Sequence, residues 1–185
     1  MSEFTIPGLS EEQSSRIRVL LQIQLSTYND LHLTLKHVHW NVVGPNFIGV
    51  HEMIDPQVEL VRGYADQTAE RLAALGASPD GTPGAILKYR TWDDYSIGRD
   101  TAQSHLAALD LVYDGVIRDA RKAIQELDEL DLVTQDMLIG QVAELEKFQW
   151  FVRAHLENSG GQLANEGASS EKQAASQAKS ESPVT

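Results

Sequence analysis

Residues 39–70 read HWNVVGPNFIGVHEMIDPQVELVRGYADQTAE, and this stretch decides the fold. Gly44-Pro45 is turn chemistry that interrupts a helix, so we expect a new helix from about Phe47 to Leu75. Apolar side chains recur in this segment at three- and four-residue steps, as on the core-facing side of an amphipathic helix. They are Val50, Ile54, Val58, Val61, Ala65, Thr68, Leu72 and Leu75.

The other face of the same helix carries potential metal ligands. At about 100° per residue, His51, Asp55, Asp66 and Glu70 fall within a sector of about 100°. His39 precedes the break as a fifth donor. Histidine with carboxylates is the mixed nitrogen and oxygen set that iron, manganese and zinc accept. The alternative is a solvated acidic helix face, but the flanking histidines favour a metal site.

The length of this row of donors predicts how a metal site is completed. Asp55 and Asp66 are eleven residues apart, which is about 16 Å along a helix axis. A metal–ligand bond is only about 2 Å long, so one ion cannot reach both ends. Two copies of the helix packed antiparallel about a two-fold axis would place His51 and Asp55 opposite the partner copy's Asp66 and Glu70. The sequence therefore predicts two equivalent sites per dimer, each built from both chains.

Composition bounds the class of protein. The 185 residues suffice for one domain with a substantial core. A net charge of −12 opposes unaided binding to nucleic acid or to an anionic membrane. The absence of cysteine excludes disulfides and thiolate metal sites. No apolar run reaches the roughly 18 residues of a membrane span, and the N-terminus lacks a secretory pattern, so we expect a cytoplasmic protein.

Helical periodicity extends over most of the chain. Ser10–Gln13 is a capping box and predicts a helix that runs to about Trp40. Residues 77–96 are rich in turn residues and predict a crossover with one small helical piece. A third helix is expected over about 97–127 and a fourth over about 133–159.

These elements predict an all-α fold, a ferritin-like four-helix bundle with a long crossover between its second and third helices. We expect an N-terminal arm at 1–9, the bundle at 10–160 and a disordered polar tail at 161–185. Ferritin-like di-iron proteins usually place Glu-x-x-His pairs inside one bundle. No Glu in this chain is followed three residues later by His, which favours a site between subunits.

The same residues carry a family resemblance. The motif His39-Trp40-Asn41, Phe47, His51, Asp55 and Asp66-x-x-x-Glu70-Arg71 resembles the signature of Dps, the starvation-induced miniferritins. The resemblance covers roughly residues 10–160 and is greatest to the actinobacterial, mycobacterial-type branch. It implies a hollow homododecamer built from two-fold dimers, with ferroxidase sites at the dimer interfaces. In that arrangement His39, His51 and Asp55 come from one chain, and Asp66 and Glu70 come from its partner.

The resemblance also implies an activity. Two Fe(II) ions at a di-iron site shared between two subunits would be oxidised by hydrogen peroxide, and more slowly by dioxygen. The Fe(III) product would be stored as mineral in the cage, protecting DNA and the cell from oxidative damage; no organic cofactor is expected. Asp66 and Glu70 would supply oxygen ligands, His39 and His51 nitrogen ligands, and Asp55 a weaker second position.

Two further residues have open roles. Lys36 either orients a ligand carboxylate or is an ordinary exposed lysine. Trp40 either absorbs stray oxidising equivalents or packs as an aromatic at the dimer interface. Acidic residues also crowd the end of the third helix, where the family has three-fold pores for iron; the alternative is a solvated helix end. They are Asp119, Glu126, Asp128, Glu129 and Asp131.

DNA binding is the main alternative function. Many Dps proteins bind DNA through basic tails, which would make this chain a nucleoid-compacting protein with secondary iron activity. Lys172 and Lys179 of this tail stand against Glu166, Glu171 and Glu181, a net charge of 2 − 3 = −1. Such a tail releases few phosphate counterions, so we expect weak or no DNA binding. A third reading is a helical assembly with other metal chemistry, such as hydrolysis.

Overall fold

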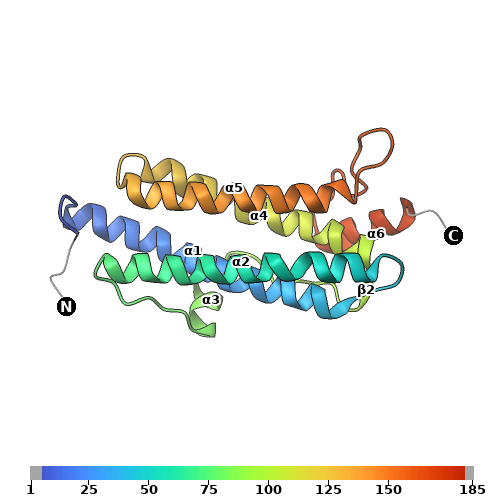
Figure 1. Ribbon diagram of the computed structural model, residues 1–185, viewed down its shortest axis with the longest axis horizontal. Helices are drawn as coiled ribbons and strands as arrows, with labels where there is room; N and C mark the ends of the chain where they lie inside the picture. The colour runs from blue at the N-terminus through green and yellow to red at the C-terminus, as the bar shows by residue number, and fades with distance from the viewer. Residues whose placement is uncertain (1–5, 182–185) are drawn as a thin grey trace.

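The computed structural model describes residues 6–181, and the rest of the expected N-terminal arm and tail lies outside the described residues. Four long helices form the body of the molecule (Figure 1). They are α1 (Glu11–Asn41), α2 (Phe47–Ala74), α4 (Ala102–Leu127) and α5 (Leu132–Ala154). The helices α1 and α2 form one hairpin, and α4 and α5 form a second that lies against it. The predicted ferritin-like bundle is confirmed.

The beginning and end of α1 follow from its sequence. The Ser10 side chain accepts a hydrogen bond from the Gln13 N–H at 3.1 Å, and the Gln13 side chain accepts from the Ser10 N–H at 3.0 Å. This is the predicted capping box. After Asn41 the chain reverses through Gly44 and Asn46, which have φ values of 86° and 63°. Only glycine and, less readily, asparagine adopt this left-handed region, so the predicted break lies where expected.

The core-facing side of α2 is also as predicted. None of its eight apolar-face residues, including Leu75 just after the helix, is more than 8% exposed. All of them except Thr68 belong to one continuous apolar core with residues of α1, α4 and α5. The helix continues through Pro56 without ending there. This fixes which side of α2 remains on the outside.

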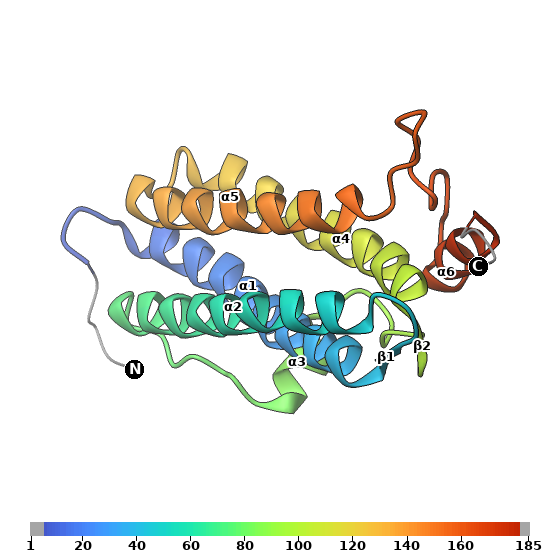
Figure 2. The same ribbon diagram turned by 45° about the vertical axis from the view of Figure 1, so that its right-hand side comes forward.

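The crossover from α2 to α4 carries the predicted short helix, α3 (Pro83–Tyr89). The crossover ends in β2 (Asp100–Thr101). This strand pairs in parallel with β1 (Val42–Val43), which directly follows α1 (Figure 2). Two-residue strands are too short to show an alternating pattern in a sequence. Because residues 97–101 are used by this loop and strand, α4 begins later than periodicity predicts. The pairing ties the crossover to the turn between α1 and α2.

The prediction of a disordered tail is wrong for residues 171–181. These form α6 (Glu171–Glu181), which packs on α4 (Figure 2). Ala174, Ala175 and Ala178 are buried in the contact, and their small side chains let the two helices approach closely. Lys179 Nζ also lies 2.7 Å from Asp100 Oδ2. Within residues 6–181, no helix is both long and apolar enough to cross a membrane.

Candidate metal centre

The hairpin of α1 and α2 brings two predicted ligands into contact. His39 lies in the last turn of α1 and His51 in the first turns of α2, and their rings stack with centroids 3.6 Å apart. Nδ1 of His39 lies 3.1 Å from the His51 carbonyl, and Nδ1 of His51 lies 2.9 Å from the His39 carbonyl. A carbonyl can only accept, so each Nδ1 carries the proton and each Nε2 keeps its lone pair. This is the tautomer in which an imidazole binds a metal through Nε2.

Asp55 lies beside the two histidines, one turn further along α2. Its Oδ1 is 2.8 Å from Lys36 Nζ and 3.2 Å from His39 Nδ1. The hydrogen bond from Lys36, assisted by the neighbouring His39 and His51, holds the pKa of Asp55 below its ordinary value. The carboxylate is therefore ionised at neutral pH. Lys36 contacts a predicted ligand, which fits the first of the two roles considered for it.

Asp66 and Glu70 lie on the exposed outer side of α2, far from the histidines. The eleven residues between Asp55 and Asp66 correspond to about 16 Å of helix. One copy of the chain thus brings His39, His51 and Asp55 together and leaves Asp66 and Glu70 apart. Within residues 6–181 of this single copy, no group of three or more His, Asp or Glu is arranged to hold a metal ion.

The surface around the histidine end is apolar as well as ligand-bearing. Trp40 is 69% exposed, and Ile48 and Leu33 are both more than half exposed. Leu33, Lys36 and Trp40 recur at three- and four-residue steps, so they share one side of α1. Phe47 packs against the His51 ring at 5.1 Å between centroids. Large exposed apolar groups around a polar cluster are typical of an interaction surface.

An open hollow continues along the same outer side, beside Asp66. Its volume is about 650 Å³, and it lies between α1 and α2. Leu25, Asn29, Arg62 and Ala69 contribute to its lining. The outer side of the hairpin is therefore hollowed at its acidic end and apolar at its histidine end.

The five candidate pore residues have different environments. Asp131 caps α5 by accepting from the Val133 and Thr134 N–H groups, and its Oδ2 also binds Arg71 Nη2 at 2.6 Å. Its side chain is only 8% exposed, so both oxygens are used within the fold and the residue belongs to the α4–α5 turn. Arg71 is thus paired inside its own chain, with Asp131 and Thr134.

Three of the other four pore candidates, all except Glu129, have partners in the fold. Glu126 pairs with Arg16, and Asp119 lies 2.8 Å from Lys122. Asp128 accepts a hydrogen bond from Gln135 at 3.1 Å. The unpaired negative charge at this end of the bundle is therefore smaller than the number of acidic residues suggests.

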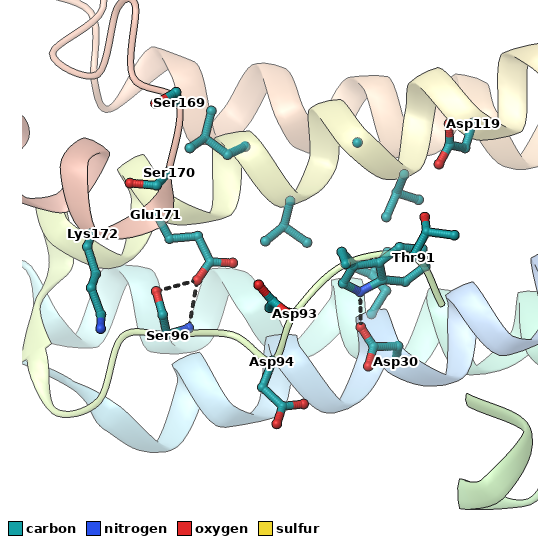
Figure 3. A pocket seen from close by; sticks show the side chains of 16 residues that line it. Asp30, Thr91, Asp93, Asp94, Ser96, Asp119, Ser169, Ser170, Glu171 and Lys172 are labelled. Carbon is teal, nitrogen blue, oxygen red and sulfur yellow. Dashed lines mark hydrogen bonds between the residues drawn. The ribbon is translucent and has the colours of Figure 1, made fainter. Parts of the chain in front are cut away.

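A second hollow, of about 490 Å³, was not predicted (Figure 3). It lies between the crossover, α1, α4 and the start of α6, where Glu171 Oε2 accepts from the Ser96 backbone at 2.6 Å and from its hydroxyl at 2.7 Å. Its wall is apolar on the α4 side, from Leu111, Val112 and Val116. Segments far apart in the sequence build it, and no local pattern marks it.

Comparisons with known proteins agree with the fold and the motif. The model of the ferritin-like domain family matches residues 19–159. The "DNA protection during starvation protein" of Mycolicibacterium smegmatis is 73% identical over 182 residues, covering 98% of this chain and all of the relative.

Two solved structures are similar over most of the chain. "Mycobacterium smegmatis Dps" is 75% identical with a TM-score of 0.90 and covers 91% of this chain and 97% of its own. "DpsA14 from Streptomyces coelicolor" is 59% identical with a TM-score of 0.86 and covers 88% of this chain and 96% of its own. The chain therefore belongs to the Dps family of ferritin-like proteins, in its actinobacterial branch.

Proposed function

We propose that this chain is the subunit of a ferroxidase and iron-storage cage that oxidises Fe(II) with hydrogen peroxide, and more slowly with dioxygen. Membership of a ferritin-like family already implies an iron-related protective role. The single observation that carries the finer proposal is the divided donor set. His39, His51 and Asp55 lie together at one end of the hairpin, while Asp66 and Glu70 are exposed and lie about 16 Å or more further along α2.

A second copy of the chain completes the site in this proposal. When two hairpins pack antiparallel about a two-fold axis, the histidine end of each faces the acidic end of the other. The exposed Trp40 and Ile48 would then be covered together with the ligands, which supports an interface over a solvated helix face. Six such dimers would make the dodecamer.

The donor set suits the substrate. Two neutral imidazole Nε2 atoms and three carboxylates can bind two Fe(II) ions while balancing most of their charge. Each Fe(II) gives up one electron, and hydrogen peroxide takes both, with two protons, to become two molecules of water. Pairing the electrons in this way avoids release of a hydroxyl radical. Glu70 would bind both ions, and Asp55 would bind the more weakly held ion. Lys36 would orient the Asp55 carboxylate.

Iron would enter through acidic pores at the end of α4. Asp128 and Glu129, together with the partly paired Asp119 and Glu126, supply the carboxylates for this part of the proposal. An acidic channel raises the local concentration of cations, and salt weakens the effect. The Fe(III) mineral would form inside the cage.

The proposal is tested by stopped-flow oxidation of Fe(II) with peroxide. Asp66→Ala and Glu70→Ala are each expected to slow the reaction by at least about 100-fold, since even partners outside the ligand set cost 10–100-fold. Glu146→Ala removes a carboxylate of α5 that pairs with Arg121 and serves as the matched control. Unchanged rates in both ligand variants would contradict the site.

We also propose that DNA binding is weak or absent at physiological salt. The tail has no excess of positive charge, and one of its two lysines is already paired with Asp100. The twelve tails of a dodecamer would strengthen DNA binding by avidity only if each tail made a favourable contact with DNA. A gel shift at low and moderate salt tests this: retention of DNA at moderate salt would instead support nucleoid compaction.

A further inference from the structure

A tyrosine and a histidine outside the metal centre form a hydrogen-bonded pair. His105 of α4 is completely buried, and the Tyr95 hydroxyl from the crossover lies 3.1 Å from its Nδ1. The two rings are stacked, with centroids 6.1 Å apart. Within the described part of the chain, His105 Nε2 is buried without a hydrogen-bond partner. Nothing in the divided donor set makes use of this pair.

Tyr95 differs from Tyr28 and Tyr113, the tyrosines that are fully buried, in the group that its hydroxyl contacts. The hydroxyls of Tyr28 and Tyr113 lie 2.9 Å and 2.6 Å from the side-chain oxygens of Gln141 and Gln57. An amide oxygen cannot take up a proton at neutral pH, whereas a neutral imidazole nitrogen can. Tyr95, which is partly buried, is therefore a phenol placed against a base.

The ionisation of both groups suits proton transfer between them. Burial raises the pKa of Tyr95 well above its ordinary value, so the phenol keeps its proton. Burial lowers the pKa of His105, so the ring is neutral at neutral pH. The carbonyls of Asn41 and Gly98 and the carboxylate of Asp100 act on the pKa of His105 in the opposite direction. The Tyr95 hydroxyl lies 3.1 Å from Nδ1 and 3.4 Å from the His105 carbonyl, so in the tautomer with its proton on Nε2 the nearer Nδ1 accepts from Tyr95.

The pair lies behind the metal-site histidines. The ring of His37 contacts Tyr95 edge-on, with centroids 5.8 Å apart, and the Asn41 carbonyl acts on His105. Positions 37 and 41 share one side of α1, while position 39 is on the opposite side. Tyr95 and His39 are thus separated by roughly one helix diameter, about 10 Å.

We propose that Tyr95, with His105 as proton acceptor, is a redox-active site that supplies the second electron to hydrogen peroxide when only one Fe(II) is bound. This inference rests on the proposed ferroxidase function. Fe(II) is oxidised to Fe(III) by one electron. The O–H bond of Tyr95 breaks, its electron goes to peroxide and its proton goes to His105 Nδ1. The O–O bond of peroxide breaks, and two electrons with two solvent protons give two molecules of water.

The surroundings allow the oxidised pair to persist and to be reset. The apolar contact of Ala175 from α6 with Ile97 and Ala108 packs against Tyr95 and covers part of it. Among the charged groups nearby, Asp100 favours a positive charge on the His105 ring and His37 disfavours it. Lys179 is paired with Asp100, and Glu171 accepts a hydrogen bond from Ser96. A later Fe(II) returns one electron to Tyr95, and His105 returns the proton.

The test uses the full-length assembled protein, loaded without oxygen with fewer Fe(II) ions than half its sites and mixed with peroxide. Samples frozen within milliseconds to seconds are read by electron paramagnetic resonance. A tyrosyl signal is expected in the native protein, and it should narrow when the tyrosines are ring-deuterated. Tyr95→Phe is expected to abolish it. Tyr28→Phe and Tyr113→Phe, which also remove one buried hydroxyl, are expected to retain it.

The base is tested separately. His105→Gln keeps a hydrogen-bond partner for Tyr95 but cannot take its proton, so the radical yield should fall severalfold while circular dichroism and size-exclusion profiles stay native. A tyrosyl signal that persists in Tyr95→Phe would overturn the proposal. Iron oxidation without any tyrosyl signal would overturn it and leave the ferroxidase function intact. If peroxide fails to oxidise Fe(II), the proposed function itself is wrong and this inference falls with it.

Discussion

His39 and His51 each use the other's backbone carbonyl to fix the proton on Nδ1. The fold of the α1–α2 hairpin therefore determines a tautomer in which each Nε2 is free to bind a metal, and no bound metal is needed to establish it. Preorganisation of this kind lowers the entropy cost of binding. The sequence predicts His39 just before the break and His51 on the helix after it, but the reciprocal hydrogen bonds depend on the left-handed turn at Gly44 and Asn46, whose geometry no periodicity shows.

Replacement of Lys36 tests the residue behind Asp55. In Lys36→Met the hydrogen bond that lowers the pKa of Asp55 is lost, so this pKa rises toward its ordinary value. On acidification, the Asp55 carboxylate of the native protein stays ionised to a lower pH than that of the variant. Fe(II) binding should therefore be lost at a higher pH in the variant than in the native protein. At neutral pH the affinity should fall about 10-fold.

Anaerobic titration with Fe(II) at several pH values measures both effects. Lys147→Met removes an exposed lysine of α5 that pairs with Glu144 and is the control. Tighter binding in Lys36→Met would show that the lysine competes with the metal for Asp55 and does not orient it.

At the scale of elements, the α4–α5 turn depends on Asp131. This side chain caps α5 and binds Arg71 at the end of α2, and so connects the two hairpins near Glu70. Composition alone suggests that Asp131 lines a pore, because a sequence gives the charge of a residue. It does not show that the side chain points into the fold. The N-cap pattern Asp131-x-x-Thr134 is the signal that could have predicted the structural role.

Asp131→Ala should destabilise the bundle by about 2–4 kcal/mol, from the lost cap and the unpaired Arg71. Burial would raise the pKa of Asp131, but hydrogen bonds from Thr134 and Arg71 lower it below its ordinary value. A lowered pKa gives stability that is complete above the ordinary value of about 3.9 and is lost as the pH falls through the native pKa.

Thermal and urea unfolding between neutral pH and pH of about 3 measure this effect. The difference between native and variant proteins should narrow on acidification. A difference that stays constant over this range would contradict the role given to the carboxylate.

The C-terminal helix is the element that composition predicted wrongly. Low apolar content indicates disorder for a chain that must form its own core, but α6 needs only three alanines because α4 supplies the rest of the contact. The run from Ser170 to Glu181 has helix-forming residues and a polar N-terminal cap position. A helix could have been predicted there; its docking could not.

Ala175→Glu should undock α6. An unpaired buried carboxylate costs at least about 1–3 kcal/mol, more than the burial of a few alanines returns. Hydrogen exchange at α6 and tryptic cleavage at Lys172 and Lys179 should both accelerate, while the protection of α1 and α2 remains. Ser176→Glu, on the exposed side of the same helix, is the control and should leave exchange unchanged.

At the scale of the whole molecule, charge and assembly have different origins in the sequence. The net charge of −12 follows from composition and predicts net repulsion between the protein and DNA. The assembly is implied by the length of the donor row, from His51 to Glu70, and by the family. A single copy shows the two halves of the proposed site and exposed apolar side chains of α1 and α2; the partner that would cover them belongs to the proposal.

Co-expression of two complementary variants tests the shared site most directly. His51→Ala lacks one half of the donor set and Glu70→Ala lacks the other. If each site is built from two chains, random assembly of both variants restores about a quarter of the sites, because one site of every mixed dimer is intact. Co-expressed His51→Ala and Asp55→Ala, which lack the same half, should restore none.

The measurement is peroxide-driven Fe(II) oxidation by the purified mixed assemblies, compared with each variant alone. The shared site predicts about a quarter of native activity for His51→Ala with Glu70→Ala, and almost none for either variant alone or for the same-half mixture. Mixed assemblies as inactive as their parents, although both chains are present in equal amounts, would show that the five residues do not meet across two chains.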